Sequence, residues 1–377
     1  IIPLLMASII DNGVNKGDKK RASVFVGNTV ILFMGISLVL SVLLLFFVKP
    51  AVAVMSTPAE AVSGTAAYLT ICFLGIPFIT AYNVISSIFR GLGDSKSPMY
   101  FIAVACAMNI ILDYLFIGFF HLGASGAALG TTLSQACSVL FALIAIKRKQ
   151  TGLSLSGDCF RPQKKPLGKI LNIGIPVALQ DGFIQIAFII ITIIANRRGL
   201  NAAAAVGIVE KIISFLFLIP SSMLSTVSAL AAQNIGAGKY DRAKQTLRYA
   251  MMIAIGFGLV VSILIQFIAA PVVGLFTADA AVILLGAQYI RGYIWDCIFA
   301  GVHFSFSGYF CACEKSGISF LHNLIAILCV RIPGVYLTSK IFPHTLFPMG
   351  LATATGSLLS VIICIIAYRW LCEKSGK

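Results

Sequence analysis

The sequence predicts an all-α polytopic membrane protein. We expect two six-helix bundles related by a parallel pseudo-twofold repeat, with twelve helices in the full protein and about ten complete spans here. First, hydrophobic residues make up 59% of the chain and charged residues 11%, whereas soluble globular chains are about half apolar and a quarter charged. Second, apolar runs of about 20 residues, long enough to cross a bilayer, recur along the chain. Third, the second half repeats landmarks of the first.

Ten apolar stretches are predicted to span the membrane, with boundaries read from where the apolar runs end. They cover residues 24–48, 66–90, 98–120, 124–146, 170–196, 203–231, 248–270, 283–311, 317–340 and 347–371.

The repeat has a nearly constant offset of 221 positions between residues 17–113 and the second half. Long offsets of this kind are typical of transporters with two structurally similar halves. The coinciding residues include Arg21-Ala22 with Arg242-Ala243, Pro50 with Pro271, Tyr68 with Tyr289 and, after three further residues, Gly126 with Gly350.

The repeat also predicts the domain organisation. Residues 168–238 precede the repeated stretch in the second half, but only 1–16 precede it in the first, so we expect about 54 positions to be missing from the N-terminus. The N-terminal lobe is then 1–146, lacking its first helix and most of its second. A cytoplasmic linker covers 147–169, and the C-terminal lobe, 170–377, has six helices and a short cytoplasmic tail. An even number of spans in each half makes the repeat parallel.

The net charge of +15 is interpreted as a topology signal and not as a nucleic-acid surface. If the ten spans alternate, one set of connections holds 21 of the 28 basic residues. The positive-inside rule places that set and the C-terminus in the cytoplasm. We expect a multi-pass protein of the cell membrane, and the short loops favour a bacterial inner membrane. The other set, called here the basic-poor connections, holds Lys49, Arg197, Arg198 and Lys340.

Acidic residues inside predicted spans are the candidate binding residues, because ionisable groups in hydrocarbon usually face a cavity or a partner. Asp181, Glu210 and Asp296 all lie in the second half. A carboxylate there can bind a proton, a sodium ion or an organic cation, and competition among these is a simple basis for exchange. Neutral contacts are expected from Gln180, Gln185, Tyr293 and His303, and Asn109 and Asp113 could contribute from the first lobe.

Each candidate also has a purely structural interpretation. Glu210 and Lys211 could pair with other charges or extend to the interface. Asp296 could pair with Arg291, although a spacing of five is poor for one helix face. Asp113 could fix the following loop, and His303 could be a hydrogen-bonded core residue.

The chain contains no zinc-protease motif, P-loop or nucleophile elbow, so we expect neither an enzyme nor a cofactor. Cys311 and Cys313 lack further ligands at metal-site spacing. We expect no metal other than Na⁺ at the acidic residues.

Four segments carry a resemblance to a known family: FRGLGDSKSPMY (89–100), NIILDYLFIG with LGASGAALGTTLSQ (109–135), GIPVALQDGFIQ (174–185) and VEKIISFLFLIPSSMLSTVSALAAQNIGAGKYDRAK (209–244). Together they resemble the multidrug and toxic compound extrusion (MATE) family over nearly the whole chain.

The resemblance implies a secondary active antiporter of two lobes. Such a protein exports cationic or amphipathic drugs and xenobiotics in exchange for Na⁺ or H⁺ by alternating access. It also implies that acidic residues of the seventh, eighth and tenth helices act in coupling and binding, where Asp181, Glu210 and Asp296 fall. We expect a monomer whose partners are small cationic substrates and membrane lipids. The alternatives are a flippase for lipid-linked oligosaccharides from the same superfamily, or a membrane-embedded enzyme or receptor.

Overall fold

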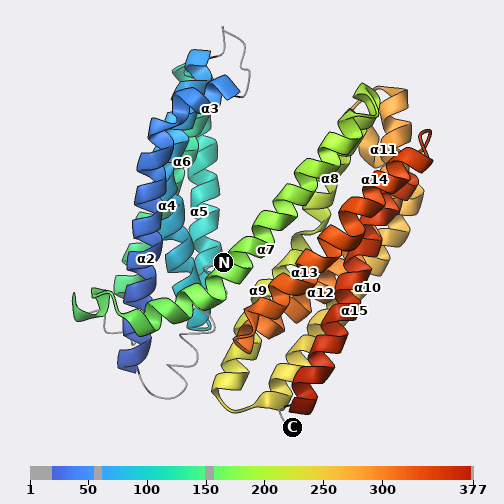
Figure 1. Ribbon diagram of the computed structural model, residues 1–377. Coiled ribbons are helices and arrows are strands. Elements are labelled where there is room, and N and C mark those ends of the chain that lie inside the picture. The colour runs from blue at the N-terminus through green and yellow to red at the C-terminus, as the bar shows by residue number, and fades with distance from the viewer. Residues whose placement is uncertain (1–18, 55–61, 149–156, 375–377) are drawn as a thin grey trace. The chain divides into compact units, whose positions relative to one another are not determined.

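The computed structural model describes residues 19–54, 62–148 and 157–374, all in helices or their short connections, with no β-strand among them (Figure 1). The chain divides at Leu171 and Asn172 into two compact units, called here the first unit and the second unit. This division falls inside a helix, because α7 begins at Lys164 and continues to Asn196.

The first unit is a helical bundle in which α4 is central. This helix packs against α2 and α6, and α6 packs against α5. Two apolar clusters hold the bundle: Val26, Val84 and Ile88 join α2 to α4, whereas Ile85, Phe89, Phe101, Val139 and Ala142 join α4, α5 and α6. Its elements are α2 (Lys19–Phe46), α3 (Val48–Val54), α4 (Val62–Gly91), α5 (Lys96–Asp113), the π-helical turn η2 (Tyr114–Phe119), α6 (Gly123–Arg148) and the 3₁₀ turn η3 (Gly157–Phe160).

The described part of the expected linker is structured and packs on α2. The Asn28 amide donates to the Arg161 carbonyl at 3.2 Å, and its oxygen accepts from the Gln163 backbone N–H at 2.7 Å. Because both groups of one buried amide are satisfied by the linker, this segment is fixed to the first unit.

The second unit has two apolar cores. In one core, α11 packs with α8, α10 and α15; in the other, α12 packs with α9, α10 and α15. After α7, the elements are α8 (Leu200–Leu216), α9 (Leu218–Gly236), α10 (Tyr240–Gly274), α11 (Ala280–Tyr293), α12 (Asp296–Ala312), α13 (Ser316–Ala326), the π-helical turn η4 (Ile327–Arg331), α14 (Ile332–Ile341) and α15 (Phe347–Lys374).

Nine of the ten predicted spans have a counterpart in the described residues. Eight are single helical segments, and the ninth is the pair α8 and α9, bent by 41°. The tenth stretch, 283–311, was expected to be continuous but is divided into α11 and α12 by a break at Ile294 and Trp295. The apolar run continues across this break, so hydropathy alone could not reveal it.

Proline accounts for one of the interruptions. The bend between α8 and α9 lies at Phe217, three residues before Pro220. Pro220 lacks the backbone N–H that would bond to the carbonyl four residues earlier, and its ring clashes with that carbonyl. Pro333 similarly follows η4 in the first turn of α14, and π-helical turns of this kind often mark functional positions in helices.

The sequence repeat is also present in the helix boundaries. The offset is 221 at the start of α10 relative to α2 and at the end of α12 relative to α4, 220 at the start of α13 relative to α5, and 224 at the start of α15 relative to α6. Two of the three extra residues expected before Gly350 therefore lie in the connection that precedes α15, which covers 342–346 where the connection before α6 covers 120–122.

A matching turn supports this repeat at atomic detail. The backbone N–H of Asp94 donates to the Phe89 carbonyl at 2.9 Å, and 221 positions later Lys315 donates to Phe310 at 2.8 Å. The residue before each donor has a positive φ, 80° at Gly93 and 60° at Glu314. Both are Schellman-type helix ends, which require a left-handed residue at this place.

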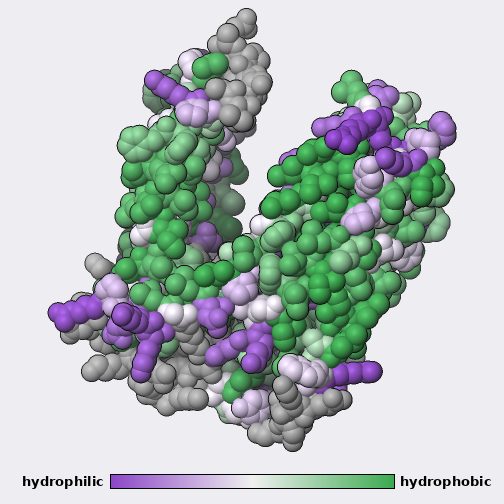
Figure 2. Space-filling view, in the orientation of Figure 1, coloured by the Kyte–Doolittle hydropathy of each residue, from purple (hydrophilic) through white to green (hydrophobic). Residues whose placement is uncertain are grey.

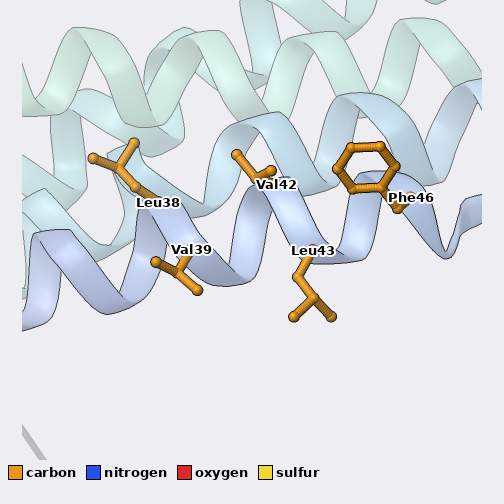
Figure 3. A pocket seen from close by; sticks show the side chains of 5 residues that line it. All are labelled: Leu38, Val39, Val42, Leu43 and Phe46. Atoms are coloured by element: carbon orange, nitrogen blue, oxygen red, sulfur yellow. The ribbon is translucent and has the colours of Figure 1, made fainter.

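Exposed apolar side chains cover much of both units (Figure 2). A cavity of about 450 Å³ on α2, lined by Leu38, Val39, Val42, Leu43 and Phe46, is part of this surface, and Figure 3 shows these side chains along the helix. All five are hydrocarbon, so the cavity offers no polar group for specific recognition and is expected to contact lipid tails.

Candidate functional site

An ion pair is buried in the second unit at the junction of broken helices. Asp296 is the first residue of α12, directly after the break that follows α11, and its side chain is 1% exposed. Arg331 is the last residue of η4. Its Nη2 atom lies 3.3 Å from Asp296 Oδ2 and donates to the Tyr293 hydroxyl at 3.0 Å.

The partner of Asp296 is therefore Arg331 and not Arg291. The Arg291 Nε atom donates to the Gln266 backbone carbonyl at 3.1 Å, and the Gln266 amide donates to the Arg291 carbonyl at the same distance. The helix break at Ile294 and Trp295 lies between Arg291 on α11 and Asp296 on α12, which explains why the neighbour in sequence is not the neighbour in space.

Aromatic rings enclose the guanidinium of Arg331. Its Cζ atom lies 5.4 Å from the centroid of the Phe188 ring and 5.9 Å from that of Tyr293. The rings of Tyr289 and Tyr293 are in edge contact, with centroids 5.6 Å apart. Cation–π attraction is strongest where the cation is desolvated, so these rings stabilise a charge that has little contact with water.

Glu210 completes an acid–base–acid cluster of Asp296, Arg331 and Glu210, called here the charged cluster. The Glu210 Oε1 atom lies 3.5 Å from the hydroxyl of Thr192. Thr192 is one helical turn after Phe188 on α7, and the Phe188 ring lies 5.4 Å from the Arg331 Cζ atom. Glu210 and the ion pair thus contact adjacent turns of α7.

Several polar atoms in and beside the charged cluster have no hydrogen-bond partner among the described residues. They are Asp296 Oδ1, Arg331 Nε and the Tyr289 hydroxyl, all buried. Buried polar atoms are nearly always satisfied in native proteins by protein, water or ions. These atoms are donors and acceptors that water, an ion or a polar ligand would satisfy.

The backbones of α11 and α15 approach closely beside Tyr293. A Cβ atom added at Gly292 would collide with the Phe347 carbonyl, and one added at Gly350 would collide with the Tyr289 carbonyl. Only glycine permits this distance. Tyr289 and Tyr293, beside the charged cluster, are thereby held against α15.

The other predicted residues of the second unit lie outside this cluster. Asp181 and Gln185 are exposed on α7. Gln180 is 1% exposed and accepts a 2.7 Å hydrogen bond from Ser319. His303 is 5% exposed, with its ring centroid 4.5 Å from Phe304 and 5.7 Å from His322.

His322 was not predicted as a site residue, yet it joins three helices. One ring nitrogen is 2.9 Å from the Ser307 hydroxyl and the other is 2.7 Å from that of Ser360. Its side chain is fully buried. A histidine in the apolar stretch of α13 was the available signal, and Arg331 carried the same signal in η4.

In the first unit, Asn109 and Asp113 form a separate pair. The Asn109 amide nitrogen is 3.5 Å from Asp113 Oδ1, both side chains are half-buried, and both lie on α5 one turn apart. Metal ligation needs several ligands around one point, and no group of three or more His, Cys, Asp or Glu residues in the described ranges is placed to hold a metal ion.

Comparison with known proteins identifies the family. A family model described as MatE matches residues 6–115 and 176–337, more than half of the chain. The probable multidrug resistance protein YpnP of Bacillus subtilis is 29% identical over 364 residues, which cover 96% of this chain and 81% of YpnP. The multidrug export protein MepA of Staphylococcus aureus is 28% identical over 342 residues, covering 89% of this chain and 74% of MepA.

The fold matches solved transporters as well. A MOP superfamily transporter from Pyrococcus furiosus superimposes with a TM-score of 0.93, covering 100% of this chain and 84% of its own, at 21% identity. The description of that structure states that the reverse polarity of its binding pocket suggests a different function for the Pyrococcus protein. At this identity the likeness shows the fold alone. From the family match, we conclude that the chain belongs to the MATE family and is a multi-pass membrane transporter.

Proposed function

We propose that this protein is a secondary active antiporter that exports cationic or amphipathic compounds in exchange for Na⁺ or H⁺. The observation that carries the proposal is the charged cluster, where the Glu210 carboxylate lies one helical turn from a buried ion pair inside a membrane-spanning bundle. With all three groups ionised, the cluster has a net charge of −1. One monovalent cation would neutralise it, which suits a site that exchanges one cation for another.

The geometry favours Glu210 as the acid that exchanges its cation. Arg331 already pairs with Asp296 and is held by aromatic rings, so a mobile cation at Asp296 would have to displace it. The described contact of Glu210 is the long one to Thr192, 3.5 Å. We therefore propose that the coupling ion or substrate binds at Glu210, and that Arg331 acts as a tethered counter-ion for Asp296.

Exposed polar residues on α7 extend this proposal. Asp181 and Gln185 are exposed on the same helix that contributes Phe188 and Thr192, and we propose that they contact the substrate. Their exposure suits groups that meet a ligand transiently. The charge distribution supports a cell-membrane orientation with the C-terminus in the cytoplasm.

Transport by reconstituted protein tests the proposal. Full-length protein in proteoliposomes is loaded with ethidium, and a sodium gradient and a proton gradient are imposed separately. We expect one gradient to drive ethidium movement, and Glu210→Gln to reduce the rate at least about tenfold, the equivalent of ~1.4 kcal/mol. The matched control is Asp241→Asn, an exposed acid in the first turn of α10, which should transport normally.

Two results would contradict the proposal. Normal ethidium transport by Glu210→Gln would exclude the assigned acid, whereas no movement with either gradient in well-folded protein would exclude the antiporter. A flippase for lipid-linked oligosaccharides is the second candidate, favoured by the buried base Arg331, because a cationic group can hold a pyrophosphate. Translocation of a fluorescent lipid-linked sugar by the same proteoliposomes would support it.

A further inference from the structure

Three of the four residues of the basic-poor connections surround one cavity of the second unit. The cavity has a volume of about 460 Å³, and its lining includes Arg197, Arg198 and Lys340 together with Ile194, Tyr336 and Ser339. It lies between the end of α7 and the end of α14. Figure 2 shows hydrophilic side chains gathered at the end of the unit where Figure 1 labels α8, α11 and α14.

Arg198 is fixed in place and retains a free donor. Its Nη2 atom donates to the backbone carbonyls of Phe342, Pro343 and Thr345, at 2.9, 2.6 and 3.1 Å. Its Nη1 atom is buried without a hydrogen-bond partner in the described part of the chain. Burial lowers the pKa of this guanidinium, so an anion that stabilises the charged form would offset the cost of burial.

The other two bases add charge to the same cavity. Lys340 Nζ lies 4.7 Å from the centroid of the Tyr336 ring, and Arg197 is exposed at the end of α7. No acidic residue lines the cavity. Like charges placed together repel one another, and basic residues are disfavoured in this set of connections by the positive-inside rule. A bound anion would remove the repulsion.

We propose that this cavity binds the phosphate group of an anionic membrane lipid. Arginine and lysine are the side chains that bind phosphate oxygens, and basic pockets between membrane helices bind lipid head groups. The neighbouring surface is suited to an acyl chain, because Leu337 and Ile341 follow Tyr336 and Lys340 on α14 and are 54% and 65% exposed. The ligand is thus an amphiphile with a phosphate head.

Thermal stabilisation of the purified full-length protein tests this site independently of transport. The unfolding temperature is measured in detergent with increasing phosphatidylglycerol, phosphatidylcholine or inorganic phosphate. We expect saturable stabilisation by phosphatidylglycerol and little by the other two. In Arg197→Gln/Lys340→Gln, half-maximal stabilisation should need about 10- to 30-fold more phosphatidylglycerol. Arg198 is left unchanged because it also holds the loop after α14.

Two control variants make the result specific. Lys49→Gln removes the remaining base of the basic-poor connections, in the first unit, and should leave the lipid response unchanged. Arg197→Lys/Lys340→Arg keeps both charges and should bind close to normally. Equal responses to both lipids, or an unchanged response in the Gln double variant, would overturn the site, and equal stabilisation by inorganic phosphate would overturn its assignment to lipid.

Discussion

Arg331 and Asp296 lie 35 positions apart in the sequence, yet their side chains form an ion pair of 3.3 Å in which the carboxylate is 1% exposed. Both residues lie at irregular points of their helices, one at the end of a π-helical turn and the other just after a helix break. The pair therefore joins the two interruptions.

Removing one partner of this pair should destabilise the protein more than removing both. Asp296→Asn or Arg331→Gln alone leaves a buried charge without its partner, and we expect a loss of about 3–5 kcal/mol in the free energy of unfolding. The double variant should recover most of that loss. Chemical unfolding in detergent measures the free energy of unfolding of the unchanged protein, the two single variants and the double variant. If the loss in the double variant equals the sum of the two single losses, the pairing is contradicted. Arg291→Gln is the matched control, because it removes only a contact to a backbone carbonyl.

Alanine at Gly292 or Gly350 should separate α11 from α15. The added methyl group collides with backbone of the facing helix in both cases, and overpacking of this kind costs about 1–3 kcal/mol. Because Tyr293 follows Gly292, transport should fall together with stability. Gly256→Ala is the control, since nothing lies within 4 Å of a Cβ at that position. If Gly292→Ala and Gly350→Ala leave the unfolding temperature unchanged, α11 and α15 can separate without loss of stability.

The turn shared by the two halves gives a third prediction. Gly93 has a φ of 80°, so Gly93→Ala should cost about 1 kcal/mol of stability because non-glycine residues are disfavoured there. Gly35→Ala, inside α2 with open space around its Cβ, should be neutral or slightly stabilising. The comparison uses unfolding temperatures of the two variants in one detergent. A larger loss at Gly35 would argue against strain as the cause.

His322 should be required for packing of the second unit. His322→Ala removes the imidazole that contacts two buried hydroxyls, Ser307 and Ser360, and leaves a cavity, so we expect a loss of about 2–4 kcal/mol. His344→Ala, at an exposed loop position, should have no measurable effect. If His322→Ala and His344→Ala have the same free energy of unfolding, the hydrogen bonds of His322 contribute nothing to stability.

The secondary structure was largely predictable from local properties of the sequence. Uniformly apolar runs require helices in a bilayer, because every backbone N–H and C=O must be bonded internally. The offset of 221 positions, first visible in pairs such as Tyr68 and Tyr289, recurs in the helix boundaries and in the turns at Gly93 and Glu314. The break at Ile294 and Trp295 was not predictable, because no proline or glycine occupies either position.

The charged cluster was only partly predictable. Glu210 and Asp296 were identified because acids are costly in hydrocarbon, but the partner of Asp296 comes from another helix and could not be read from spacing. Asp181, Gln180 and His303 lie outside the charged cluster, and their part in binding stays a prediction. His322 was overlooked because its serine partners are not adjacent in the sequence.

The sequence by itself determined that this chain forms apolar helices, that its halves repeat and that a few charges lie within the membrane. These properties depend on hydropathy and periodicity, which each segment carries alone. The tertiary structure decided which charges meet: Arg331 with Asp296, and Arg197 with Arg198 and Lys340 around one cavity. Such pairings depend on helix breaks and on close backbone contacts such as Gly292 with Gly350, because these set the rotation and distance of each helix relative to its neighbours.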